Sequence, residues 1–119
     1  MPALNFKTQF AELVESGKKK QTIRQVWKNP IKVGDTLYLY TGMRTKQCRK
    51  LREGVCKSVK DIRITSMCVK LDGIELTLLD YIAFAKRDGF TSQADFADFF
   101  IHEYGLPFEG VLIEWDQPQ

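Results

Sequence analysis

The sequence predicts a single α+β domain, on two observations. Three stretches, near residues 6–16, 78–86 and 93–103, have apolar residues at helical spacing and carry capping or terminating residues at their ends. Between them lie short runs of β-branched and aromatic residues, which are typical of strands, and we expect five or six strands. The chain has 119 residues, a length at which one hydrophobic core suffices, so residues 1–119 are expected to form one domain.

The first predicted helix leads directly into a cluster of cations. Asn5 is placed to cap the start of this helix, and Gly17 to end it in a left-handed conformation. The residues that follow include four cations and a hydroxyl: Lys18, Lys19, Lys20, Thr22 and Arg24. This cluster predicts a site for an anion or a nucleic acid, although Lys18 and Lys20 taken alone are better explained as a solvated surface turn.

Ile23 and Val26 mark a short strand after this turn. Within a strand, Thr22 and Arg24 share one face, whereas Gln21 shares the other with Ile23. If Ile23 faces the core, Thr22 and Arg24 face a cleft or solvent. There they could hold a phosphate, a carboxylate or the edge of a base.

Lys19 is the candidate for a chemical role. Because neighbouring cations disfavour its charged form, its pKa is expected to fall, and the neutral amine can act as a base or a nucleophile near neutral pH. Strict strand alternation would place Lys19 and Thr22 on opposite faces. The chain must therefore curl between Lys19 and Gln21 if the two side chains are to act together.

A second basic segment, Arg44 to Arg52, follows an apolar strand predicted at residues 36–40 and is expected to form a long, positively charged hairpin arm. Its candidate binding residues are Arg44, Thr45, Arg49 and Arg52. Tyr38 and Tyr40 share one face of the preceding strand. Packing under a helix is the favoured interpretation of both, but Tyr40 is kept as a candidate because aromatic rings beside cations can stack on unpaired bases.

The acidic half of the chain is interpreted mainly as scaffold. Two pairs have the spacing of a capping box and predict helix starts, Thr77 with Asp80 and Ser92 with Asp95. These helices should end near Gly89 and at Tyr104-Gly105. The phenylalanines of residues 96–100 share one helix face and are interpreted as core, and His102 as a surface or half-buried histidine rather than a catalytic one.

Asp88 is set apart from the other acidic residues because it lies in the short link between these two helices. A carboxylate there could orient Lys19, act as a general base for water, or accept a hydrogen bond from the exocyclic amine of cytosine. A solvated helix end is the other interpretation, and the residues alone leave both open.

Composition narrows the classes of function. The chain lacks a secretory pattern at its start and any run near the roughly 18 apolar residues that span a bilayer, so a cytoplasmic protein without a membrane partner is expected. Cys48, Cys56 and Cys68 are odd in number and widely spaced, with only His102 to complement them. Neither a disulfide framework nor a structural zinc site is therefore expected, and no metal or other cofactor is predicted.

Charge is unevenly distributed along the chain. Residues 1–60 contain 14 Lys and Arg against 4 Asp and Glu, a balance of +10, whereas residues 61–119 contain 4 against 11, a balance of −7. If each half forms a coherent surface, a phosphate backbone would lie on the positive one. In the alternative, the two halves intermix within one domain and their fields partly cancel.

The spacing Gly-x-Lys-x-x-Thr-x-Arg, at Gly17, Lys19, Thr22 and Arg24, resembles the motif of the ASCH domain family. Further segments follow the family pattern in order, and the resemblance spans nearly the whole chain: residues 33–35, 37–45, 88–92, 104–105 and 111–115. The resemblance implies a small PUA-like mixed β-barrel with two or three flanking helices. It also implies that RNA or a nucleotide binds in a cleft lined by the motif.

One bacterial branch of the ASCH family hydrolyses the acetyl amide of acetylcytidine with a lysine, a threonine and a glutamate. Lys19 and Thr22 match the first two. In the loop equivalent to that of the glutamate, the nearest carboxylate is Asp88, which is one methylene shorter and has one extra residue before the following helix.

The leading hypothesis is a nucleotide- or RNA-recognising domain in which Thr22 attacks an exocyclic amide, Lys19 accepts its proton and Asp88 orients the lysine or water. Arg24 or Arg44 would hold a charged part of the ligand, and the protein is expected to be a monomer. The main alternative is a non-catalytic RNA-binding module, whose affinity would depend on the outer cations: Lys18, Lys20, Arg44, Arg49 and Arg52. Ribonuclease activity would lack a histidine pair or a carboxylate cluster, and nothing in the sequence tests a protein-binding role of the acidic half.

Overall fold

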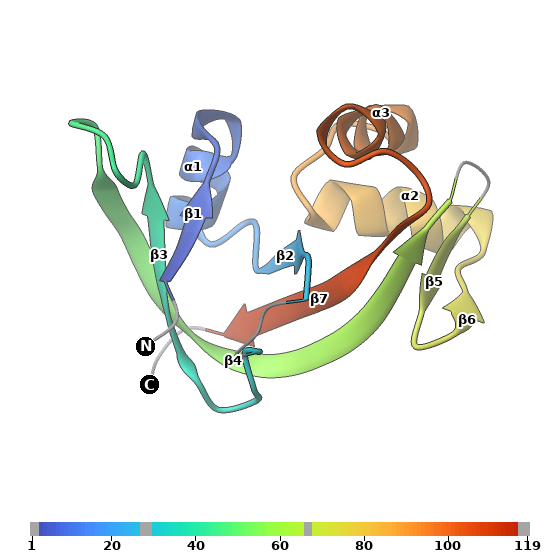
Figure 1. The fold of residues 1–119 in the computed structure, drawn as a ribbon, viewed down its shortest axis with the longest axis horizontal. Helices are drawn as coiled ribbons and strands as arrows, with labels where there is room; N and C mark the ends of the chain where they lie inside the picture. Colours follow the sequence, from blue (N-terminus) through green and yellow to red (C-terminus); the bar gives the residue numbers. More distant parts are fainter. Residues whose placement is uncertain (1–2, 27–29, 66–67, 117–119) are drawn as a thin grey trace.

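The computed structural model describes residues 3–26, 30–65 and 68–116, which form three α-helices and seven β-strands (Figure 1). The helices are α1 (Thr8–Ser16), α2 (Leu78–Arg87) and α3 (Gln93–Glu103). The strands are β1 (Ala3–Phe6), β2 (Gln21–Arg24), β3 (Thr36–Thr41), β4 (Arg49–Ile64), β5 (Val69–Leu71), β6 (Ile74–Glu75) and β7 (Phe108–Asp116). The predicted α+β class is confirmed, and no helix in these ranges is long and apolar enough to cross a membrane.

The described strands belong to one mixed sheet built around β4, which is 16 residues long. β3, β5 and β7 each pair with β4 in the antiparallel direction; β1 joins β3 in parallel, β6 joins β5, and β2 joins β7. β4 has an extra residue relative to its partners at Leu51 and at Lys57, and such bulges bend a long strand. The helices lie on the concave side of this bent sheet, α1 over the β1–β3 end and α2 and α3 over the opposite end (Figure 1).

The sheet is not closed into a barrel, which corrects the closed barrel of five or six strands that we expected. Within the described ranges, one row of strands runs from β1 to β6, and a branch through β7 ends at β2. A side chain links β1 to β2, because Nη2 of Arg24 donates a hydrogen bond to the Asn5 carbonyl oxygen (2.7 Å). The structure has more strands than the five or six expected, because the chain before α1 forms the strand β1, with alternating burial, and because the two-residue β6 is also a strand.

The core lies between the helices and the concave face of the sheet. Leu37 and Leu39 of β3 and Trp115 of β7 are buried under the helices. Phe96 and Phe100 of α3 are buried as well, with their ring centroids 4.9 Å apart, which confirms the interpretation of these two as core, whereas Phe99 is half-buried.

The helix ends follow the sequence signals with one exception. Gly17 ends α1 in the left-handed region, with φ of 84°, as predicted. Thr77 and Ser92 cap α2 and α3 through hydrogen bonds from the Asp80 and Asp95 amides (3.2 and 3.1 Å), which confirms both capping pairs. The predicted cap at Asn5 is wrong, because Asn5 belongs to β1 and its Oδ1 accepts a hydrogen bond from the Met43 amide (3.0 Å).

Candidate functional site

A pocket of about 200 Å³ lies between β1, α1 and β2 on one side and α3 and the α2–α3 link on the other. Four of the residues predicted to form the site line it: Lys19, Thr22, Arg24 and Asp88. Five aromatic residues also line it, Phe10 from α1 and Phe90, Phe99, Phe100 and Tyr104 from the side of α3. The structure therefore brings the sequence motif and Asp88 together around one cavity.

Lys19 and Asp88 form a buried ion pair at this pocket. Their side chains are 3% and 5% exposed, and Nζ of Lys19 lies 3.2 Å from Oδ1 of Asp88. The same Nζ donates a hydrogen bond to the Asp88 carbonyl oxygen (2.5 Å) and lies 4.9 Å from the centre of the Phe10 ring. The Asp88 carboxylate is thus buried. The alternative interpretation of Asp88 as a solvated residue at a helix end is therefore wrong.

The backbone after α1 explains how Lys19 and Thr22 reach the same pocket. The Lys19 amide donates a hydrogen bond back to the Leu13 carbonyl (2.9 Å), so the chain folds against α1 at this point. One residue later, the Lys20 carbonyl accepts a hydrogen bond from the Trp115 amide (3.0 Å) in β7. The backbone thus changes its hydrogen-bond partner from α1 to β7 between Lys19 and Lys20. The chain curls at this point, as it must if Lys19 and Thr22 are to act together.

Burial acts on both partners of the pair in the direction of the neutral form. It lowers the pKa of Lys19 from its ordinary value of 10.5, against the opposing attraction of Asp88. It raises the pKa of Asp88 from its ordinary value of 3.8, against the opposing effects of Lys19 and of a hydrogen bond from Gln21. A lowered pKa of Lys19 was expected, but its main cause is burial rather than crowding by the exposed Lys18 and Lys20.

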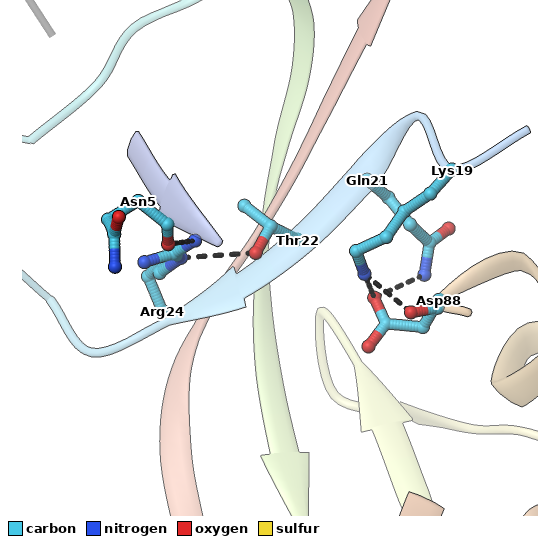
Figure 2. A network of polar contacts seen from close by, with 6 residues as sticks. All are labelled: Asn5, Lys19, Gln21, Thr22, Arg24 and Asp88. Carbon is cyan, nitrogen blue, oxygen red and sulfur yellow. Dashed lines mark hydrogen bonds and ion pairs between the residues drawn. The ribbon is translucent and has the colours of Figure 1, made fainter. Parts of the chain in front are cut away.

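Thr22 and Arg24 share one face of β2, as strand alternation predicted. Nε of Arg24 donates a hydrogen bond to the Thr22 hydroxyl oxygen (3.1 Å), and the guanidinium carbon lies 5.0 Å from the centre of the Phe6 ring. Burial lowers the pKa of Arg24, yet a guanidinium keeps its charge in proteins. Figure 2 shows Thr22 between the Arg24–Asn5 contact and the cluster of Lys19, Gln21 and Asp88.

Gln21 is the site residue that the sequence analysis missed. It is 4% exposed, and its Nε2 donates a hydrogen bond to Oδ1 of Asp88 (3.2 Å; Figure 2). A usable signal was present, because alternation put Gln21 on the same face as the core residue Ile23. A buried amide needs a hydrogen-bond partner.

The other candidate residues lie outside the pocket. Lys18 and Lys20 are exposed, as are Arg44, Thr45 and Arg49, whereas Arg52 and Tyr40 are half-buried in the β3–β4 hairpin. Arg49 is paired with Glu15 of α1 (2.6 Å). The hairpin comes near the pocket at its turn, where the Met43 amide donates a hydrogen bond to Oδ1 of Asn5.

In the ranges that the structure describes, neither a cysteine nor His102 lines the pocket. No group of three His, Cys, Asp or Glu residues in these ranges could hold a metal ion. Cys48, Cys56 and Cys68 are free thiols, and His102 is exposed. A larger open hollow of about 610 Å³ lies over β4, β5 and β7, but none of the candidate site residues lines it. Its Arg63 and Glu109 pair with each other (3.1 Å).

Comparisons of this chain with models of protein families, with curated proteins and with solved structures gave no match. The ASCH resemblance, and the function drawn from it, therefore stay predictions that rest on the motif.

Proposed function

We propose that this protein is an ASCH-like, PUA-related cytoplasmic domain that recognises a modified nucleobase, in a nucleoside or in RNA, and hydrolyses its exocyclic acetyl amide. One observation carries the proposal: Lys19 and Thr22, together with Asp88 from a distant part of the chain, are buried around one pocket that aromatic residues also line. Buried ionisable groups with perturbed pKa values, next to a hydroxyl in a cleft, are typical of nucleophilic sites.

Thr22 is the nucleophile in this proposal. Its oxygen accepts a hydrogen bond from Nε of Arg24, so its own proton is free to be donated elsewhere. Attack on the acetyl carbonyl carbon forms a tetrahedral oxyanion, and breakage of its C–N bond releases the cytosine amine and leaves an acetyl ester on Thr22. Water then hydrolyses that ester. Arg24 is the cation nearest to the attacking oxygen and stabilises the oxyanion.

Lys19 is the proton carrier. Its lowered pKa favours the neutral amine, which accepts the Thr22 proton and returns it to the leaving nitrogen. No hydrogen bond joins Lys19 to Thr22 among the described residues, so we assign the transfer to a bridging water. Asp88 holds Nζ of Lys19 through its carboxylate and its carbonyl oxygen, and it thereby orients the lysine.

The dimensions of the pocket favour a single base. A volume of about 200 Å³ is below the roughly 300–1,000 Å³ of pockets for drug-sized ligands. Among the aromatic residues that line the pocket, Tyr104 is exposed, and stacking of a base on its ring would contribute about 1–3 kcal/mol. A ribose or a longer chain would then remain outside.

The test is incubation of the purified protein with acetylcytidine, with cytidine release followed by chromatography. We expect release by the wild-type protein and its loss in Lys19→Ala and in Thr22→Val. Lys32→Ala, which removes an exposed lysine away from the pocket, is the matched control and should retain activity. Absence of release from folded wild-type protein would exclude this substrate, and equal release by Lys19→Ala would point to a contaminating enzyme.

A non-catalytic RNA-binding module is the second candidate. It is favoured by the exposed basic turn of the β3–β4 hairpin, in which Arg44 takes a left-handed conformation with φ of 67°. Such a module would bind single-stranded RNA with an affinity that falls steeply with salt. Loss of affinity on substitution of Arg44, together with no release of cytidine, would favour it over the hydrolase.

A further inference from the structure

The hydrogen bond between Gln21 and Asp88 gives Gln21 a role that the proposed mechanism does not contain. Oδ1 of Asp88 lies 3.2 Å both from Nε2 of Gln21 and from Nζ of Lys19. The three side chains are each 5% exposed or less, so bulk water cannot substitute for any of these contacts.

We propose that Gln21 is a positioning residue that holds the Asp88 carboxylate in one rotamer, and through it fixes Nζ of Lys19. The contacts among Gln21, Asp88 and Lys19 are observed in the structure, whereas their effect on turnover rests on the proposed function. Gln21 can reach Asp88 because β2 runs past the α2–α3 link with this side chain turned away from Thr22 (Figure 2).

An amide is well suited to this role. Its Nε2 is a donor only, so it stabilises a carboxylate that accepts a hydrogen bond and it carries no charge that would compete with Lys19. Burial opposes ionisation of Asp88 and raises its pKa, and the Gln21 hydrogen bond is one of the interactions that lower it again. Without Gln21, the carboxylate would both rotate more freely and take up a proton more readily.

The second carboxylate oxygen of Asp88 is the group that this arrangement leaves for chemistry. Among the described residues none donates a hydrogen bond to Oδ2, and no fully buried side-chain oxygen or nitrogen there lacks a partner. Asp88 lines the pocket, so Oδ2 is the carboxylate oxygen that a ligand there could contact. Holding Oδ1 with Gln21 and Lys19 directs Oδ2 toward water or the ligand.

Two charged side chains act on Asp88 among the described residues. Lys19 reaches it from the turn after α1, and Arg24 acts on it from β2. Lys86 and Arg87, which precede it on α2, are exposed. A change in the titration of Asp88 on substitution of the neutral Gln21 therefore reports the missing hydrogen bond rather than a missing charge.

The test is an NMR titration of the Asp88 carboxyl carbon in the wild-type protein and in Gln21→Met, which keeps the length of the side chain and removes the donor. We expect the midpoint to move to higher pH by about one unit or more, the size expected when a carboxylate loses one hydrogen bond. Gln25→Met makes the same change at an exposed position and should leave the midpoint in place.

A measurement on the wild-type protein covers the case in which Gln21→Met does not fold. The Gln21 side-chain amide protons should shift with the same midpoint as the Asp88 carboxyl carbon. Independent titrations, or an unchanged Asp88 midpoint in Gln21→Met, would overturn the inference.

Kinetics then separate this inference from the proposed function. With acetylcytidine, Gln21→Met should lower kcat by about tenfold or more with little change in KM, and shift the pH profile of kcat. A wild-type protein that releases no cytidine would end the hydrolase proposal, while the NMR titration still decides whether Gln21 controls Asp88. Normal turnover in Gln21→Met with an unchanged profile would overturn the role of Gln21 in catalysis.

Discussion

The ammonium group of Lys19 lies 3.2 Å from the Asp88 carboxylate, although 69 residues separate the two along the chain. This ion pair joins the turn after α1 to the link between α2 and α3, the two sides of the pocket. Taking two charges out of water is costly, and an ion pair recovers that cost only with good geometry and further hydrogen bonds. Here the Asp88 carbonyl oxygen accepts a further hydrogen bond from Lys19, and the Gln21 amide donates one to the Asp88 carboxylate.

Breaking this pair on one side should be strongly destabilising. Lys19→Met leaves the Asp88 carboxylate buried without its cation, and Asp88→Asn leaves the ammonium group without its anion. We expect each to lower the free energy of unfolding by about 3–5 kcal/mol at neutral pH. Denaturant unfolding of both single variants and of the double variant provides the measurement.

The double variant Lys19→Met with Asp88→Asn is the control for that experiment. Since it leaves no uncompensated charge, its loss of stability should be much smaller than the sum of the two single losses. Simple additivity would show that the two groups do not interact energetically.

The pair should also make stability depend on pH in a defined direction. Burial raises the pKa of Asp88 above 3.8, so the folded protein binds more protons there than the unfolded chain does. The contribution of Asp88 to the free energy of unfolding is therefore lost as pH rises above 3.8. The pKa of Lys19 is lowered below 10.5 in the folded protein. The contribution of Lys19 to the free energy of unfolding is therefore fully present above pH 10.5 and is lost as pH falls through this lowered pKa.

The measurement is the free energy of unfolding of the wild-type protein relative to the double variant, as a function of pH. The difference should fall between pH 3.8 and neutrality and rise again toward pH 10.5. A difference that grew between pH 3.8 and neutrality would mean that the ion pair outweighs burial.

Thr22→Val should separate catalysis from folding. Valine has nearly the same shape, but Nε of Arg24 loses its acceptor, so we expect a loss of about 1–3 kcal/mol in stability and complete loss of acetylcytidine turnover. Thr22→Ser keeps the hydroxyl and should retain a measurable kcat. Turnover by Thr22→Val comparable to that of wild type would remove Thr22 from the role of nucleophile.

Most of the helical scaffold could be predicted because its signals are local. The capping pairs at Thr77 and Ser92 and the left-handed Gly17 depend on neighbouring residues, and all three are confirmed. Asn5 failed because it has the capping residue type at a plausible place, yet pairing of β1 with β3 takes it into the sheet. That pairing joins residues far apart in sequence and leaves no local signal.

The site was only partly predictable for the same reason. Lys19, Thr22 and Arg24 stand close together in the sequence, and the convergence of Asp88 on them came from the family resemblance. Gln21 could not be assigned a partner until the fold brought the α2–α3 link against β2. The open sheet differs from the expected barrel because the described part of β1 meets β2 through the Arg24 side chain and not through a strand ladder.

Gly110→Ala should disturb the strand that carries the motif. A Cβ atom at position 110 would lie 2.3 Å from the Arg24 carbonyl oxygen, a distance at which backbone must move. We expect a loss of about 1–3 kcal/mol in unfolding free energy, since overpacking against backbone cannot be relieved by a side-chain rotamer. Thermal unfolding measures it, and an unchanged midpoint would show that β2 and β7 separate without cost at this point.

The basic hairpin offers a test that distinguishes the two candidate functions. Arg44→Gln and Arg52→Gln remove cations outside the pocket, so under the hydrolase proposal kcat/KM for free acetylcytidine should change little. Affinity for a single-stranded RNA should instead fall, and the slope of log K against log salt should decrease by about 0.7 for each phosphate that the hairpin no longer neutralises. Fluorescence anisotropy with a labelled oligonucleotide at several salt concentrations gives this slope. If both substitutions left the slope unchanged while abolishing turnover of the free nucleoside, the hairpin would belong to the catalytic pocket and not to an RNA-binding surface.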